Sequence, residues 1–245
     1  MGVDRNLSWD GLFNVRDLGG LERIRRGAVV RSENPEALTA AGWDALWAHG
    51  VRTVVDLRND DERGADTAPR PSGLTTVYAP LEDYDGEAEF WRPYRETGLW
   101  GTPLYYQAFL DRFPQPVAAA VTAVARAGPG GVLVHCAVGK DRTGLVVLML
   151  LALAGVAAED IVADHALSNE RLRPVWARLG VADQVTAVAD LLAKHGTTAE
   201  ACLLETLAAV DAEAYLRSAG VRADDLAAVR ARLLGGRGEH AEVVA

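Results

Sequence analysis

The amino-acid sequence predicts an α/β fold, in which a central, mostly parallel sheet is flanked by helices and followed by a helical C-terminal region. Short β-branched runs alternate with helical segments up to about residue 155, and after Gly155 every segment has apolar residues at helical spacing. A charged, glycine-containing loop also joins a buried strand directly to a buried helix. With 245 residues, of which 49% are hydrophobic, the chain is long enough to bury the core of one domain, residues 1–245.

The first part of the chain alternates strands with helices and turns. Three β-branched, apolar segments are predicted strands: residues 28–31, 53–57 and 75–79. Between the first two, Thr39 is expected to cap a helix that runs to His49 and is closed by Gly50. Residues 14–20 end in a double-glycine turn, and residues 59–63 form a turn of acidic and basic residues.

Residues 81–101 have a different composition, both acidic and aromatic. Seven of the sixteen aromatic residues of the chain fall between Tyr84 and Tyr106. We interpret residues 81–101 as a long loop with one helical turn, and long loops in compact domains often carry function.

The second part of the chain contains one more strand and is otherwise helical. Residues 131–134 are an apolar run that is typical of a buried strand. Apolar spacing predicts helices at residues 104–113, 116–127, 145–154, 160–168, 183–195, 200–210, 212–217 and 224–234.

Composition excludes several classes of partner. A net charge of −9 argues against nucleic acid and against general adhesion to anionic membranes. The apolar stretch 145–158 is too short to span a bilayer, so we expect no stable membrane insertion. Two cysteines, Cys136 and Cys202, are too few for a disulfide framework. Since residues 1–10 also lack an apolar signal region, we expect a cytoplasmic protein, with export without a signal peptide left open.

The loop from His135 to Gly144 carries the chemistry. It places Cys136 after the strand and Arg142 six positions later, at the start of a helix. Such a loop turns backbone N–H groups inward and adds the positive end of the helix dipole, which together form an anion site. The same field favours a thiolate at Cys136. This combination of nucleophile and anion receptor suits phosphoryl transfer through a cysteinyl-phosphate.

The pattern Cys-Xaa5-Arg-Thr between a strand and a helix resembles the signature loop of cysteine-based tyrosine phosphatases. Its fuller form, His-Cys-Xaa-Xaa-Gly-Lys-Asp-Arg-Thr-Gly, is similar to that of the bacterial lipid-phosphatase-like, atypical dual-specificity branch. Further matching blocks run from about residue 14 to residue 234: Asn14–Gly20, Arg31–Ser32, Asp56–Arg58, Asp160–Asp164 with Ser168–Asn169, and Ala214–Gly220. The resemblance implies the cysteine-phosphatase fold.

The resemblance also implies roles for the loop residues. Cys136 would attack phosphorus, and the backbone N–H groups of Ala137, Val138, Gly139, Lys140, Asp141 and Arg142 would hold the phosphate oxygens. The guanidinium of Arg142 would bind two of these oxygens together. Thr143 could donate a hydrogen bond to the thiolate and lower its pKa. No cofactor is implied, and no cluster with metal-ligand spacing is present in the sequence, so the mechanism is expected to be metal-independent.

The proton donor stays open between two aspartates. Asp83 follows the third strand, at the position of an aspartate in the family, but it could be only a solvated acid. Asp141 lies in the loop itself, and its alternative role is to shape the loop by pairing with Lys140 or Arg58. Asp85 is a third choice. Of these, we favour Asp141 as a site residue.

Other residues are expected to support the site from outside it. His135 is expected to orient the loop by hydrogen bonding, and Arg58, Arg16 and Asp17 to form ion pairs around it. Lys140 either binds further phosphates, as in phosphoinositide phosphatases, or neutralises Asp141. The aromatic residues either pack a helix or wall a slot for a phenyl phosphate.

Two C-terminal segments complete the interpretation. Residues 171–198 correspond to a helical lid in a member of the family and could serve as one here, and residues 199–235 are expected to form C-terminal helices. Cys202 is expected to be a core residue on a helix face.

The sequence therefore predicts a phosphatase that acts on phosphotyrosine in proteins, with phosphoserine, phosphothreonine and phosphoinositides as further candidate substrates. The alternatives are an inositol-polyphosphate phosphatase of the same mechanism and, more remotely, a phospho-ligand-binding module without turnover. The module is disfavoured because Cys136 and Arg142 are both present.

Overall fold

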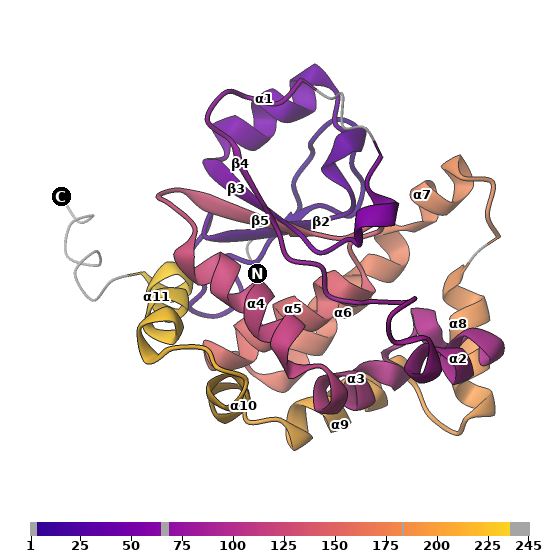
Figure 1. The fold of residues 1–245 in the computed structure, drawn as a ribbon. Helices are drawn as coiled ribbons and strands as arrows, with labels where there is room; N and C mark the ends of the chain where they lie inside the picture. The colour runs from indigo at the N-terminus through magenta and orange to yellow at the C-terminus, as the bar shows by residue number, and fades with distance from the viewer. Residues whose placement is uncertain (1–3, 65–68, 183, 236–245) are drawn as a thin grey trace.

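The computed structural model describes residues 4–64, 69–182 and 184–235. It contains a five-stranded sheet in the order β1-β2-β5-β3-β4 (Figure 1). The strands are β1 (Arg16–Asp17), β2 (Val29–Ser32), β3 (Val51–Asp56), β4 (Thr75–Tyr78) and β5 (Gly131–His135). All neighbouring pairs are parallel except β1 with β2. The predicted α/β class with a mostly parallel sheet is confirmed.

Helices cover both faces of the sheet. They are α1 (Ala40–Ala48), α2 (Ala88–Thr97), α3 (Tyr106–Arg112), α4 (Pro114–Arg126), α5 (Asp141–Leu153), α6 (Ala158–Arg171), α7 (Arg173–Arg178), α8 (Gln184–Lys194), α9 (Ala199–Ala209), α10 (Ala212–Ser218) and α11 (Ala223–Leu234). Short 3-10 turns lie at Pro35–Ala37, Asp60–Glu62, Leu99–Gly101 and Pro103–Tyr105. Figure 1 shows α1 on one side of the sheet and the larger helical layer on the other.

Alternation along the strands explains these two layers. Leu133 of β5 and Val54 of β3 pack in a small core with Trp43 and Leu46 of α1. Their neighbours along the strands face the opposite layer and join the large core formed by helices such as α4 and α5. Because successive strand residues point to opposite faces, an almost continuous apolar strand can serve both cores.

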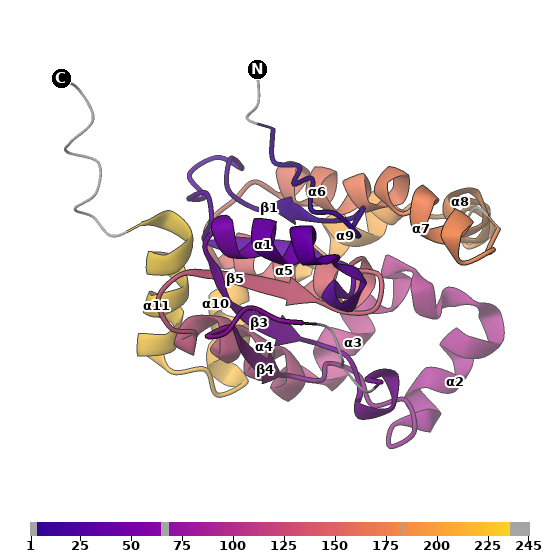
Figure 2. The same cartoon turned by 90° about the horizontal axis from the view of Figure 1, so that it is seen from above.

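The carboxyl ends of the parallel strands meet at one edge of the sheet. The arrow of β5 points toward the end of the molecule at which α2, α7 and α8 lie (Figure 2). The loop that follows β5, the residues after β3 and those after β4 therefore emerge together. In open α/β sheets this edge is the usual place for a ligand site.

Most of the predicted strands and helices are present with shifted ends. Three elements of the structure, α2, β1 and α7, were not predicted. Residues 81–101 contain a ten-residue helix, α2, rather than a loop with one turn. Its sequence concealed it because Glu87 gives no side-chain cap and Pro93 lies inside the helix, where proline is normally unfavourable. Strand β1 and helix α7 were also missed. Helix α5 begins at Asp141, four residues before the predicted start, and residue 183 lies outside the described residues.

Candidate active site

The loop between β5 and α5 has its carbonyl groups tied outward to the surrounding chain. The donors are Asn34 N–H to Ala137 at 3.0 Å, the side-chain amide of Asn14 to Val138 at 2.9 Å, and the guanidinium of Arg31 to Gly139 at 2.8 Å. Turning the carbonyl groups out leaves the N–H groups facing in. Within the described chain, none of the N–H groups of residues 137–142 bonds to a protein acceptor. They lie at the N-terminus of α5 and together form a receptor for an anion.

Glycine is required at position 139 of this loop. Gly139 has φ +72°, and a Cβ there would lie 2.2 Å from the carbonyl oxygen of Ser32. Both the backbone angle and the close approach to β2 exclude a side chain. The loop can therefore lie flat against the end of β2.

A buried carboxylate holds the outer side of the loop. Asp164 of α6 accepts from Arg31 at 2.8 Å, from Arg16 at 3.1 Å and from Arg5 at 2.7 Å. Burial alone would raise the pKa of Asp164, but the guanidinium groups of Arg16 and Arg31 outweigh burial and hold that pKa well below its usual range. Arg31 thus connects Asp164 to the carbonyl of Gly139. Sequence reasoning did not choose Arg31 or Asp164 as site residues, although both lie in blocks that carried the family resemblance.

Cys136 lies at the closed end of the receptor. It follows β5 directly, is 2% exposed and is a free thiol. His135 approaches its carbonyl oxygen with Nδ1 at 3.1 Å, and His135 Nε2 lies 3.6 Å from Asp56. Burial lowers the pKa of His135 to about 4, so the ring is neutral and Nδ1 donates its proton to Cys136 O. This geometry agrees with the loop-orienting role expected for His135.

The hydroxyl of Thr143 is buried and has no hydrogen-bond partner among the described residues. The hydrogen bond from Thr143 to the sulfur of Cys136, which the sequence suggested, is therefore not formed in this structure. That Thr143 lowers the pKa of the Cys136 thiol stays a prediction.

Arg142 is held by two carboxylates that sequence reasoning did not choose. Its Nη2 lies 2.6 Å from Glu62 Oε1, its Nη1 bonds the other oxygen of Glu62, and its Nε lies 3.4 Å from Glu82. Glu62 ends the turn after β3, and Glu82 follows β4. Burial would raise the pKa of Glu62, but its hydrogen bonds to Arg142 outweigh burial and lower it. The planar fork of Arg142 that would bind two phosphate oxygens is thus occupied by a carboxylate.

Glu82, rather than Asp83, is the acid after β4 that faces the loop. Glu82 is 4% exposed and accepts hydrogen bonds from the hydroxyls of Tyr84 and Tyr105, the latter at 2.8 Å. Its pKa is raised, chiefly by burial. Asp83 is exposed, and its carboxylate accepts the N–H of Gly86 at 2.8 Å, which shapes the turn. Because side chains alternate direction along extended backbone, only one of the two neighbours points inward. The structure therefore does not bring Asp83 to the loop.

Asp141 has the features of a proton donor. Its Oδ1 is buried without a hydrogen-bond partner among the described residues, and burial raises its pKa despite the nearby charges of Lys140 and Arg142. Its backbone carbonyl accepts the hydroxyl of Tyr106 at 3.0 Å, which in turn lies 3.1 Å from Nε2 of His165. The backbone of Asp141 is thus held in place, while burial shifts the pKa of its carboxyl group in the direction that favours the protonated form.

The two expected pairings of Asp141 are not formed. Arg58 pairs with Asp56 at 2.8 Å and with Glu36 at 2.7 Å, because it lies two residues after the first and faces the second. Neither Lys140 nor Asp141 has an ion pair within the described ranges. Arg58 therefore orders the end of β3.

The remaining supporting residues divide into two groups. Arg16 lies in the Asp164 network and also donates to Asn14 at 2.7 Å, so it supports the loop indirectly. Asp17 instead accepts from Gly19 and Gly27 and pairs with His49 at 2.9 Å. Asp17 therefore shapes the N-terminal turn, and none of these contacts connects it to the loop.

The aromatic residues of 84–106 mainly pack against one another. Trp91 of α2 forms edge contacts with Tyr84, Phe90 and Tyr105. Trp100 is the exception, with 52% of its surface exposed. The packing interpretation describes most of this group, but the hydroxyls of Tyr84 and Tyr105 bond the carboxylate of Glu82, and that of Tyr106 bonds the backbone carbonyl of Asp141.

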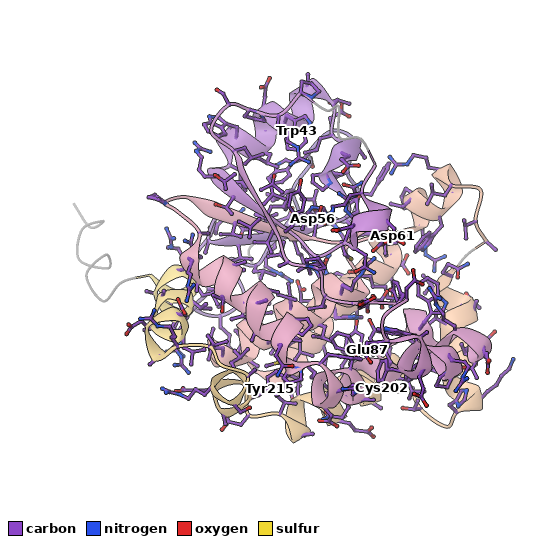
Figure 3. The ribbon with its side chains drawn as sticks, in the orientation of Figure 1. Trp43, Asp56, Asp61, Glu87, Cys202 and Tyr215 are labelled. Carbon is purple, nitrogen blue, oxygen red and sulfur yellow. The ribbon has the colours of Figure 1, made fainter. Side chains whose placement is uncertain are left out.

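Three further observations concern the expected chemistry and location. Cys202 is buried on α9, and Figure 3 places it in the helical layer, well apart from Asp56 at the end of β3. Within residues 4–64, 69–182 and 184–235, no three His, Cys, Asp or Glu side chains gather as metal ligands. Over the same residues, no helix has the length and apolar character needed to cross a bilayer.

Comparisons with known proteins agree with this arrangement. A model described as the tyrosine phosphatase family matches residues 7–235. The chain is 35% identical over 177 residues to a putative tyrosine-protein phosphatase of Cupriavidus necator, covering 68% of this chain and 64% of that protein. It is 33% identical over 165 residues to a tyrosine-protein phosphatase of Nostoc commune, covering 61% of this chain and 51% of that protein.

A third relative matches over nearly its whole length. The chain is 28% identical to the triple specificity protein phosphatase PtpB of Mycobacterium tuberculosis, covering 92% of this chain and 98% of that protein. In contrast, the matches span only about two thirds and one half of the first two relatives.

Proposed function

The chain belongs to the tyrosine phosphatase family, and from this premise we propose that it hydrolyses phosphotyrosine in proteins through a cysteinyl-phosphate intermediate. The observation that carries the proposal is the loop itself. Its carbonyl groups are tied outward by Asn14, Asn34 and Arg31, so a set of inward N–H groups surrounds the position after Cys136. Preorganised donors of this kind stabilise the charge that develops on transferring phosphoryl oxygens.

The reaction follows from the positions of three side chains. The thiolate of Cys136 attacks phosphorus, forming a sulfur–phosphorus bond as the bond from phosphorus to the tyrosine oxygen breaks. Arg142 leaves Glu62 and binds two phosphoryl oxygens, which have the same planar spacing as the carboxylate it releases. Asp141, whose pKa is raised by burial, gives its proton to the departing phenolate oxygen.

The second step reverses the proton transfer. The carboxylate of Asp141 takes a proton from a water molecule that attacks the phosphocysteine. The sulfur–phosphorus bond then breaks, and Cys136 leaves as a thiolate. Inorganic phosphate is the product.

Lys140 supports a second candidate substrate class. Its ammonium group belongs to the same loop, and no carboxylate in the described part of the chain lies within ion-pairing distance of it. A further phosphate of an inositol phosphate or phosphoinositide would complement that charge. The name of the M. tuberculosis relative indicates a broad substrate range in that protein, and we extend this to the present chain only as a proposal.

One comparison of substrates tests the proposal. The wild type is assayed on a phosphotyrosine peptide, a phosphoserine peptide and a soluble phosphoinositide, with Cys136→Ser as the inactive control. We expect the highest kcat/KM on phosphotyrosine and no turnover in the variant. Turnover by Cys136→Ser at the wild-type rate would refute the covalent mechanism. We also propose a cytoplasmic location, since both cysteines are free and the nucleophile needs a reduced thiol; cell fractionation tests this.

A further inference from the structure

A cavity lies between the helical layer and the predicted lid segment, residues 171–198. It has a volume of about 390 Å³ and is enclosed by α6, α8 and α9, which are labelled in Figure 1. Most of its wall is apolar, including Val162, Val188, Leu192, Leu203 and Leu204. Its size and apolar wall are those of a small-molecule site.

The lining of the cavity follows most of α6 and includes both acidic and basic side chains. Residues of α6 line it from Glu159 to Asn169, which is about 15 Å along a helix. Glu200 of α9 also lines it and adds a second carboxylate to the wall. Toward the Asn169 end, His165 lines the cavity and lies 3.1 Å from the hydroxyl of Tyr106, which bonds the phosphate-binding loop.

Lys140 supplies the charge at the loop end of the cavity. It is the one lining residue from the phosphate-binding loop and is only 9% exposed. No ion pair of Lys140 exists within the described chain, and a nearly buried ammonium group favours an anionic partner. His165 beside it is neutral, since burial and the cations Arg31 and Lys140 hold its pKa well below the usual value. The loop end is therefore positive, whereas the carboxylates lie elsewhere on the wall.

The outer wall of the cavity is weakly attached. Of the eleven residues of α8, Leu192 is the only buried one. An element with so little buried surface opens at low free-energy cost. We therefore expect α8 to open and admit a chain, against which its apolar side chains then pack.

We propose that this cavity binds the alkyl chain of a single-chain amphiphile whose anionic head group lies at Lys140. The apolar walls of α6, α8 and α9 would cover the chain, and the carboxylates of Glu159 and Glu200 would disfavour the reversed orientation. A head group at Lys140 also lies on the phosphate-binding loop. Occupancy of the cavity therefore weakens the binding of a phosphate monoester at Cys136, and this kinetic consequence alone rests on the proposed function.

Calorimetric titration of the full chain tests the proposal without any turnover. The probe is dodecanoate below its micelle concentration, compared with decanoate and octanoate. We expect a single site whose affinity rises about fourfold for each added methylene. Dodecyltrimethylammonium, which has the same chain and the opposite charge, should bind at least tenfold more weakly. Equal binding of the cation would overturn the assignment of the head group to Lys140.

Variants locate the site. Ala166→Phe and Ala189→Phe each fill the cavity from an exposed helical position, and either should weaken dodecanoate at least tenfold. Ala187→Phe, on α8 but outside the cavity lining, is the matched control and should change affinity less than twofold. Lys140→Gln should weaken dodecanoate at least fivefold without weakening the cationic probe. Wild-type affinity in both cavity-filling variants would refute the site.

A kinetic measurement then connects the site to the loop. Dodecanoate should raise the apparent KM for an aryl phosphate at unchanged kcat, and Ala166→Phe should remove this inhibition. If dodecanoate binds but the KM stays constant, the head group does not lie at the loop and the proposal fails. If the chain turns over no aryl phosphate at all, the proposed function fails, while the calorimetric result still decides the cavity.

Discussion

Arg142 gives both of its terminal nitrogens to the carboxylate of Glu62, with Nη2 2.6 Å from Oε1. The two residues follow different strands: Glu62 lies in the turn after β3, and Arg142 lies in the loop after β5. They meet because β3 and β5 are parallel neighbours. The carboxylate occupies the same planar face of the guanidinium that two phosphoryl oxygens would take. We therefore expect Glu62 to compete with a phosphate group for Arg142.

Removing the charge of Glu62 should strengthen phosphate binding. The pair is partly exposed, so we expect it to contribute about 1 kcal/mol, which corresponds to about a fivefold lower inhibition constant for inorganic phosphate in Glu62→Gln. Asp60→Asn, in the same turn but paired with Arg63, is the control and should leave the inhibition constant unchanged. Weaker phosphate binding in Glu62→Gln would show instead that Glu62 positions Arg142 for substrate.

Asp141 should be the proton donor, and its role should depend on the leaving group. Asp141→Asn is expected to lower kcat on phosphotyrosine about 100-fold or more, but to have little effect on an aryl phosphate whose phenol has a low pKa. Asp83→Asn should leave both rates near the wild type, because Asp83 is turned away from the loop. Equal losses in the two variants would remove Asp141 from this role.

The raised pKa of Asp141 predicts how kcat and the stability of the fold change with pH. The donor is active in its protonated form, so kcat should fall as the pH rises through its folded-state pKa, and this limb should be missing in Asp141→Asn. The folded state holds this proton more tightly than the unfolded state does. The contribution of Asp141 to the free energy of unfolding is therefore lost as the pH rises from the unfolded-state pKa through the folded-state pKa. Asp141→Asn should therefore be no less stable than the wild type at neutral pH, as measured by urea unfolding.

Glu82 should contribute more to stability than its exposed neighbour. Its carboxylate joins the hydroxyls of Tyr84 and Tyr105 to Arg142 in a buried group. Glu82→Ala leaves these partners unpaired, so we expect a loss of about 3 kcal/mol in the free energy of unfolding. Asp83→Asn should stay within about 0.5 kcal/mol. A similar small change in both variants would mean that the buried group is not a stabilising network.

The site residues that could be predicted lie close together in the sequence, and those that could not are brought together only by the sheet. The nucleophile, Arg142 and the anion receptor were predictable because all of them lie within seven consecutive residues, and local geometry relates a strand end to the following helix. Glu62 and Glu82 were not, because their role arises only when separate strands bring their following turns together. Of two adjacent acids after β4, the sequence could not tell which one faces inward.

The fold, like the site, was predictable where local sequence determines it and not where distant residues do. The parallel strands and most helices follow from local apolar spacing, so the sheet and both layers were predicted. Helix α2 was not, since it contains Pro93 and begins without a side-chain cap, and it is held in place by the packing of Trp91 against aromatic residues outside the helix. The ion pairs of Asp164 with three arginines could not be predicted either, because the paired residues are up to 159 positions apart in the sequence.

Gly139 should be essential because of its surroundings as well as its backbone angle, and Gly196 separates the two effects. Both glycines have nearly the same positive φ, +72° and +71°, but a Cβ at Gly196 meets nothing within 4 Å, whereas one at Gly139 would lie 2.2 Å from Ser32 O. Gly196→Ala should cost only the backbone strain of about 1 kcal/mol, with unchanged activity. Gly139→Ala must in addition push the loop away from β2, so we expect a larger loss of stability and a fall of about 100-fold in kcat/KM for an aryl phosphate. The comparison combines urea unfolding with initial rates, and equal effects of the two substitutions would show that the close approach of the loop to β2 is not needed.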